Sequence, residues 1–471
     1  MNKVIPSVIS LLALAAILAF ALKDSIRPKE QLPPIKSSQP SQDTGIKSAK
    51  PSSKDVAQIS EAASTSKFGA RIYTSLQNPN MQWWFNLPPN STPHIAPIKK
   101  LFIGQTFSIF SFLDKAQIKD GKFSVTYSIE VVTPDNARET LLKPTLFEGE
   151  KKSKDVILAC PDIITANATK DYKEGRYFFE ISAKDNISGQ EAKGSTYADF
   201  VKWSPPNPFV GEKLVYDYIR GFYLQPSAEH LYSIFFSKDL NLEQKGAPNS
   251  LNYTLIGFLK AAFKNCSFLM DEIRKNFKSY DNLERSKIIF LMAICNADAI
   301  DDSLLTQKER DYQKRIREAS FPDPYKSWDR VLGAAQMDML FGEFMADGTY
   351  APIRRVMDLL SYASEAEFAE KAIAEKKKPE APSDREKFML GILNRTAIYS
   401  LLRRAHQDPL IADYCIWAIL NNDVPANGVA EFKPFFIKDA NNSQHQTETP
   451  KAAGKKEPEH QNVKTPSIES R

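Results

Sequence analysis

The spacing of apolar residues changes once along this chain, at the proline-rich segment WSPPNP of residues 203–208. Before it, apolar and polar residues alternate, for example over 123–131 and 177–184, which predicts strands with one buried face. After it, apolar residues recur every three or four positions, which predicts helices. Because proline continues neither a strand ladder nor a helix, we place a domain boundary here.

The chain has 471 residues, which is enough for two or three domains. We expect a β-sandwich domain over 68–203 and an all-α domain over 209–437. Residues 23–67 and 438–471 are rich in polar residues and proline and follow neither period. We therefore predict that they form a disordered linker and a disordered tail.

The sequence DYKEGRY at residues 171–177, followed by an alternating strand, resembles the corner of immunoglobulin-like and fibronectin-type sandwiches. The resemblance makes Tyr177 the tyrosine that caps the corner and gives structural roles to Asp171 and Gly175. It implies an antiparallel immunoglobulin-like sandwich over 97–203, and it implies no activity. The chain departs from the antibody pattern because no cysteine follows two positions after Tyr177.

Three stretches of the second domain share one plan, in which an amphipathic helix, a short polar turn and a second helix follow one another. They cover 251–277, 325–362 and 385–420, and the first helix of the middle stretch is expected over 325–346. The plan resembles the helical hairpins of HEAT and tetratricopeptide repeats, as in exported bacterial proteins. Because no repeat consensus matches and the spacing is irregular, an α-solenoid and a plain helical bundle both stay open.

An uncharged apolar run occupies residues 4–22. Its length just reaches the roughly 20 residues that a helix needs to cross a bilayer. Ala19-Phe20-Ala21 also fits the cleavage site of a secretory signal peptide. The run therefore predicts a transmembrane anchor or a signal peptide, and hence a single-pass membrane protein or a secreted, periplasmic one. In either case we expect most of the chain outside the cytoplasm.

The charge balance argues against nucleic acid as a partner, and the cysteine spacing argues against a zinc site. The 62 basic residues nearly balance the 57 acidic ones, whereas a nucleic-acid-binding protein would show a strong basic excess. No cysteine pair has the spacing of a zinc site, so we predict no metal. Cys266 and Cys295 fall in neighbouring predicted helices and are candidates for a disulfide in an oxidising compartment. The alternative is that both are buried as small apolar side chains.

No motif identifies a catalytic or cofactor site. The sequence contains neither H-E-x-x-H nor G-x-S-x-G, and it has no glycine-rich phosphate loop. We therefore predict no cofactor and favour a protein without catalytic activity. An enzyme with an unrecognised site in the helical domain is the alternative, and it would need a pocket that gathers His230, Asp239 or Asp298 with perturbed pKa values.

Trp83, Trp84 and Phe85 are the best candidates for a binding feature. If exposed, they could stack on sugar rings or peptide side chains; if buried, they fill the sandwich or its junction with the helices. Our hypothesis is a membrane-tethered, extracytoplasmic binding or scaffold protein of the cell envelope, held to the membrane through residues 4–22 and bound to a protein partner. Glycan or surface-polymer binding through the three aromatic residues is a further alternative.

Overall fold

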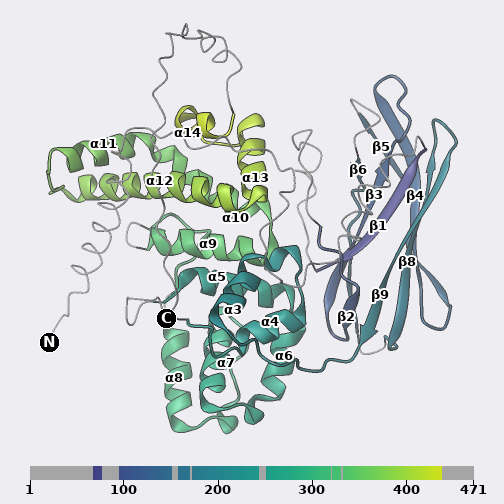
Figure 1. The fold of residues 1–471 in the computed structure, drawn as a ribbon, viewed down its shortest axis with the longest axis horizontal. Coiled ribbons are helices and arrows are strands. Elements are labelled where there is room, and N and C mark those ends of the chain that lie inside the picture. Colours follow the sequence, from purple (N-terminus) through teal and green to yellow (C-terminus); the bar gives the residue numbers. More distant parts are fainter. Residues whose placement is uncertain are drawn as a thin grey trace, which may run out of the picture.

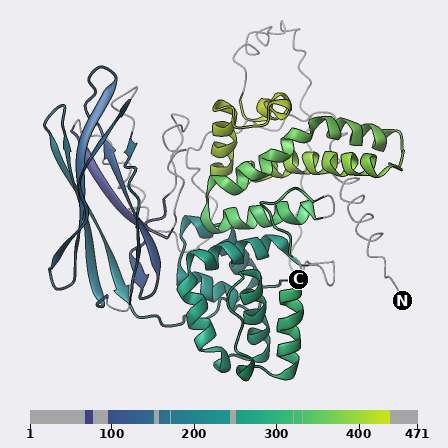
Figure 2. The ribbon, with the colours of Figure 1, turned by 180° about the vertical axis from the view of Figure 1, so that it is seen from behind.

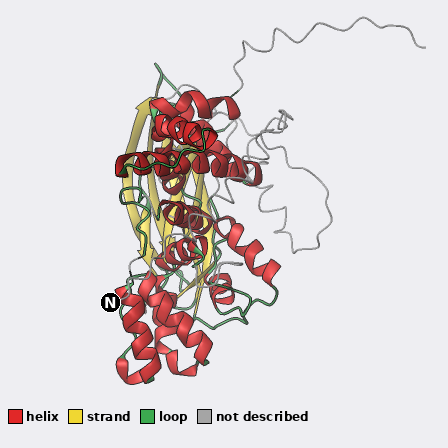
Figure 3. Cartoon of the chain, turned by 90° about the vertical axis from the view of Figure 1, so that its left-hand side faces the viewer, coloured by secondary structure: helices red, strands yellow, loops and turns green. Residues whose placement is uncertain are grey.

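Strands come first in this protein and helices follow. Strands β1 to β9 lie on one side of the molecule and helices α3 to α14 on the other (Figure 1), and the view from behind shows the same division (Figure 2). Seen from the helical side, the sheets lie behind the helices (Figure 3). The computed structural model describes residues 67–76, 95–150, 157–169, 172–242, 251–319, 321–329 and 332–437.

The strands form two sheets. The larger has the order β2-β9-β8-β4-β5, and β2 runs parallel to β9 while the other pairs are antiparallel; its strands are β2 (Lys100–Phe102), β4 (Lys122–Val132), β5 (Arg138–Glu150), β8 (Gly175–Asp185) and β9 (Glu191–Val201). In the smaller sheet β3 pairs antiparallel with each of the other three; its strands are β1 (Gly69–Ser75), β3 (Thr106–Asp114), β6 (Leu158–Ala159) and β7 (Ile164–Asn167).

The predicted fold class is therefore wrong. In place of an antiparallel immunoglobulin-like sandwich, the described strands form two open sheets, and the larger is mixed because the short β2 joins β9 in parallel. Alternation fixes which face of a strand is buried, but it does not fix the neighbour or the direction of that strand. The buried face of β4 consists of the expected side chains Phe123, Val125, Tyr127, Ile129 and Val131.

The helices begin after the proline-rich segment. The first six are α3 (Glu212–Arg220), α4 (Ala228–Phe235), α5 (Tyr253–Asn265), α6 (Ser267–Lys275), α7 (Asn282–Ile294) and α8 (Gln307–Glu318). The next are α9 (Gly333–Asp347), α10 (Tyr350–Met357), the 3-10 helix η6 (Asp358–Tyr362), α11 (Ala363–Ala374), α12 (Pro382–Gln407), α13 (Pro409–Leu420) and α14 (Ala426–Phe432). The resemblance to HEAT and tetratricopeptide hairpins stays a prediction.

One expected helix is shorter than predicted. The apolar spacing predicts a helix over 325–346, but α9 begins only at Gly333. Residues 321–329 contain no helix, and Pro322 and Pro324 lie at the start of this irregular segment. Proline restricts the residue before it to extended backbone, so the irregular path at the start of this segment has a local cause.

The structure also corrects the prediction of a single-pass membrane protein with a transmembrane helix. Across the described ranges, no helix combines the length and the apolar character needed to cross a membrane. The run at 4–22 that led to the prediction lies outside the described residues, as do the predicted tail at 438–471 and all but the last residue of the predicted linker at 23–67.

Helices α5 and α9 pack backbone against backbone. A Cβ atom on Gly342 would lie 1.9 Å from the carbonyl oxygen of Thr254, and one on Gly257 would lie 2.0 Å from that of Met339. Neither distance allows a side chain, so two glycines on facing helices determine how closely the helices approach. Helix α9 lies between α5 and the later helices α10 and α12 (Figure 1).

An aromatic joint connects the strands to the helices, and its members are Phe102, Trp203, Tyr232 and Phe268. The Trp203 ring centroid lies 4.8 Å from that of Phe102 and 5.7 Å from those of Tyr232 and Phe268. Phe102 belongs to β2, Tyr232 to α4 and Phe268 to α6. The joint merges the interior of the strand-rich part with that of the first helices into one apolar core.

A polar hollow beside helix α9

The irregular segment 321–329, called the strap below, is held to α9 by one buried side chain. Gln336 is only 2% exposed, and its Nε2 donates hydrogen bonds to the carbonyl oxygens of Asp323 at 2.7 Å and Ser327 at 3.1 Å. Its Oε1 accepts a hydrogen bond from the backbone N–H of Asp329 at 2.8 Å. A single amide thus provides partners for three backbone groups that have none within a helix or sheet.

Arg355 of α10 holds the strap from a second direction. Its Nε donates to the carbonyl oxygen of Pro324 at 3.2 Å, and its Nη2 donates to that of Lys326. Its Nη1 donates to the carboxylate of Asp358 at 2.8 Å, which pairs the positive charge. The guanidinium carbon lies 4.5 Å from the ring centroid of Trp328, a cation–π contact that fixes the indole in place.

Two further contacts tie the strap to α9 and to Leu332, the residue just before it. The Tyr325 hydroxyl donates to Oε1 of Glu343 at 2.7 Å, and the carboxylate of Asp329 accepts from the backbone N–H of Leu332 at 2.7 Å. The strap is therefore held near both of its ends and in its middle. Irregular backbone held in this way is ordered before any ligand arrives.

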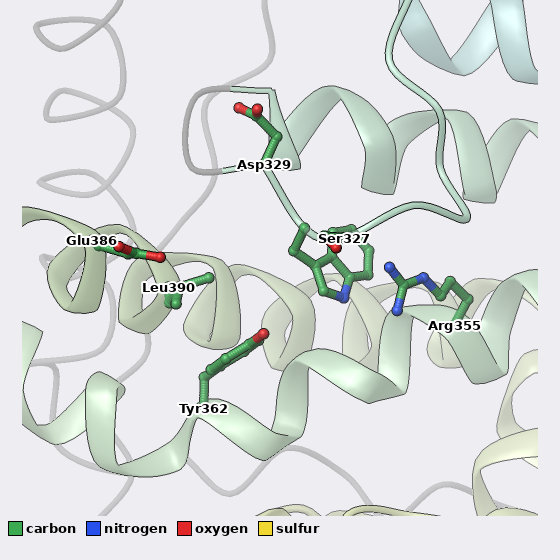
Figure 4. Close-up of a pocket in the computed structure, with 7 residues that line it drawn as sticks. Ser327, Asp329, Arg355, Tyr362, Glu386 and Leu390 are labelled. Atoms are coloured by element: carbon green, nitrogen blue, oxygen red, sulfur yellow. The ribbon is translucent and has the colours of Figure 1, made fainter. Parts of the chain in front are cut away.

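The strap forms one wall of a hollow of about 620 Å³, a size within the range of small-molecule sites. Tyr362 extends from η6 toward the strap, Glu386 and Leu390 come from α12, and Arg355 lies at the other end (Figure 4). The complete lining consists of Ser327, Trp328, Asp329, Arg355, Tyr362, Glu386 and Leu390.

The hollow combines aromatic rings with both hydrogen-bond donors and acceptors. Within the described part of the chain, neither the Tyr362 hydroxyl nor the Glu386 carboxylate hydrogen-bonds another residue, so both are available to a ligand. The indole Nε1 of Trp328 is shielded from solvent and has no hydrogen-bond partner. An unpaired buried donor costs about 1–3 kcal/mol.

Three carboxyl groups of helices α9 and α13, none of which lines the hollow, have raised pKa values. Burial raises the pKa of Asp347 to about 7 and that of Asp413 to about 6, and it also raises the pKa of Glu343. Asp347 accepts hydrogen bonds from the backbone N–H and the hydroxyl of Thr349, both at 2.9 Å. In the part of the chain that the structure describes, no three acidic, histidine or cysteine side chains are grouped to hold a metal ion.

The residues expected for an enzyme site do not converge. His230 packs against aromatic rings, and burial lowers its pKa. Asp239 accepts a hydrogen bond from the backbone N–H of Gly211 at 2.7 Å, and the exposed Asp298 pairs with Arg274 at 3.2 Å. Each of the three has its own separate surroundings, and no described hydrogen bond or ion pair joins any two of them.

The other predicted site residues fall in different places. Trp83, Trp84, Phe85 and Asp171 lie outside the described residues. The buried Tyr177 accepts a hydrogen bond through its hydroxyl from the backbone N–H of residue 173 at 3.1 Å. Gly175 has a φ of +137°, and a Cβ there would lie 3.0 Å from the ring of Pro134, so the position requires glycine.

The candidate disulfide between Cys266 and Cys295 is not formed. Cys266 and Cys295 are both free, and burial raises the pKa of each thiol to about 12. Each therefore stays protonated at neutral pH and fits the alternative interpretation as a small buried side chain. Cys266 lies between α5 and α6, where the Gln105 amide contacts its sulfur at 4.0 Å.

Sequence reasoning missed the hollow, because none of the predicted site residues lines it. The available signal was the pair Pro322 and Pro324, which indicates irregular backbone just before an aromatic residue. The spacing of apolar residues gives no indication that Gln336 is buried, since its partners are backbone groups of the strap. Only the folded arrangement shows that these groups belong together.

Comparisons with known proteins add little. No protein-family model matches the chain, and no curated protein is similar to it. One solved structure is described as "The details of glycolipid glycan hydrolysis by the structural analysis of a family 123 glycoside hydrolase from Clostridium perfringens". It is 11% identical to this chain, the matched region covers 36% of this chain and 37% of the other, and the TM-score is 0.19. A likeness this distant carries no argument about fold or function.

Proposed function

We propose that this chain is a non-enzymatic binding protein and that the hollow beside the strap is its ligand site. The observation that supports this is the fixation of the strap by Gln336 and Arg355, which together form hydrogen bonds with five of its backbone groups. A wall ordered in advance lowers the conformational entropy that binding would otherwise cost.

We further propose that the strands and the helices act together as one scaffold. The aromatic joint supports this, because it packs the two parts against each other. Lys100 of β2 also forms an ion pair with Glu229 of α4, with 2.6 Å between Nζ and Oε1. Because this pair is exposed, it contributes little energy and serves mainly to orient the two parts. A protein partner for this scaffold stays a prediction from the sequence.

Ligand-observed saturation-transfer NMR on the full chain tests the proposal. The probes are four sets of small polar solutes, namely neutral disaccharides, amino acids, nucleotides and polyamines. We expect at least one set to receive saturation from the wild type and to lose that signal in Trp328→Phe. If no set gives a signal that depends on Trp328, the proposal is wrong.

Trp417→Phe is the matched control. Trp417 resembles Trp328 in having a buried Nε1 without a partner, and its ring packs 4.9 Å from that of Tyr350. It does not line the hollow. We expect this variant to bind like the wild type, and equal loss in both tryptophan variants would show a general loss of structure and contradict a site at the hollow.

A further inference from the structure

We infer that the hollow binds a short neutral saccharide, which it recognises through hydroxyl groups. This inference rests on the proposed function, since it names the class of ligand for the same site. It is drawn from the mixture of donors, acceptors, rings and charges that line the hollow.

The charges on the lining disfavour an anion. The carboxylate of Glu386 repels an anionic ligand, and the charge of Arg355 is already paired with Asp358 at 2.8 Å. A neutral ligand avoids this penalty.

The hydrogen-bonding groups favour hydroxyls. Glu386 only accepts hydrogen bonds, whereas Arg355 only donates them and keeps unused N–H groups after its three bonds to the strap and Asp358. Ser327 and Tyr362 can do either. A sugar hydroxyl donates and accepts at once, so one ligand type matches all four side chains. An ammonium group offers no acceptor and a phosphate offers few donors.

The rings supply the apolar part of the recognition. Tyr362 extends into the space between α12 and the strap (Figure 4), and the Trp328 indole is held in the strap by Arg355. Aromatic faces carry partial negative charge and attract the slightly positive C–H groups of a ligand. A saccharide has such C–H groups on its ring faces and hydroxyls around its edge. Leu390 adds an aliphatic contact on the same side as Glu386.

The test is a titration of the full chain with maltose and cellobiose, monitored by saturation-transfer NMR, with spermidine and glycerol phosphate as charged comparisons that also carry C–H protons. We expect saturable binding of at least one disaccharide. Tyr362→Phe keeps the ring and removes the hydroxyl, so it should weaken binding roughly fivefold, the value of one ordinary hydrogen bond. Glu386→Gln should weaken binding three- to tenfold, because a charged acceptor is replaced by a neutral one.

Tyr399→Phe is the matched control for the tyrosine. Tyr399 is 58% exposed on α12, and it does not line the hollow. We expect this variant to leave disaccharide binding unchanged, and a loss equal to that of Tyr362→Phe would overturn the inference.

The outcomes separate this inference from the proposed function. Trp328-dependent binding of spermidine alone, weakened by acid and lost in Glu386→Gln, or of glycerol phosphate alone, would overturn the saccharide class and leave the binding site standing. Absence of any Trp328-dependent signal with all four probes, together with a negative result for amino acids and nucleotides, would overturn both. Disaccharide binding that survives Trp328→Phe would place the sugar elsewhere and overturn the inference.

Discussion

Helix α9 makes two contrasting contacts. Toward α5 it packs backbone on backbone at Gly342, where no side chain fits. Toward the strap it uses the buried amide of Gln336 to hold irregular backbone in one shape. The first contact fixes the position of two helices in the core, and the second fixes a piece of surface. One helix therefore uses backbone packing to build the core and a side-chain amide to order an irregular segment at the surface.

The glycine contact should be the less tolerant of the two. In Gly342→Ala the new methyl group would lie 1.9 Å from the carbonyl oxygen of Thr254, so the two helices must separate. Overpacking of a core commonly costs 1–3 kcal/mol, and because this clash is with backbone we expect about 3 kcal/mol or a failure to fold. Urea denaturation followed by circular dichroism measures the loss.

Gly221→Ala is the control for that experiment. A Cβ at Gly221 meets nothing closer than 3.7 Å, and the φ of −103° suits any residue. We expect a change in the free energy of unfolding of less than about 1 kcal/mol. Similar losses in the two variants would mean that the close crossing of α5 and α9 is not a determinant of stability.

The strap contact should be weaker but still substantial. Gln336→Met keeps the size of the side chain and removes all three hydrogen bonds to the strap. At about 1 kcal/mol each, we expect a loss of roughly 2–3 kcal/mol in the free energy of unfolding. Gln307→Met, at an exposed glutamine of α8, should change it by less than about 0.5 kcal/mol. An equal effect in both variants would exclude a special role for Gln336.

A smaller effect should appear at the C-terminal end of α9. The pKa of Asp347 is raised to about 7, so the folded state holds a proton that the unfolded state loses near pH 4. Its contribution to stability is therefore full below pH 4 and is lost as the pH rises to about 7. Asp347→Asn should be about 1–2 kcal/mol more stable than the wild type at pH 8, and equally stable near pH 4.

Thermal unfolding as a function of pH measures this difference. The asparagine keeps the oxygen that accepts from Thr349, so the two hydrogen bonds from Thr349 survive the substitution. A wild type that is more stable than the variant at pH 8 would contradict the account of Asp347.

The smallest effect concerns the end of α5. Because Cys266 and Cys295 are free, a reducing agent should leave the unfolding temperature unchanged. A drop in the unfolding temperature on reduction would show that the protein contains a disulfide after all.

The sequence was informative where local pattern decides the structure. Alternation identified the buried face of β4 from Phe123 to Val131, because a strand turns successive side chains to opposite faces. It could not show that β2 joins β9 in parallel, since that depends on partners far apart in the chain. The predicted sandwich failed for this reason.

The candidate site was not predictable in the same way. Apolar spacing extended the helix back to Tyr325 because Leu332 and Met339 fit its period, and it had no means of reading the bonds of Gln336. Trp328 looks like any core aromatic residue in the sequence. Its place in a hollow depends on Arg355 and Tyr362, which come from elements later in the chain.

Amide hydrogen exchange of the strap tests the central claim most directly, namely that its irregular backbone is fixed before a ligand binds. We predict that the backbone N–H of Asp329, which donates to Gln336, is protected in the free protein to an extent comparable with the amides of α9. The protection should disappear in Gln336→Met while that of α9 persists. An Asp329 amide that exchanges in the wild type as fast as an unprotected one would contradict the account.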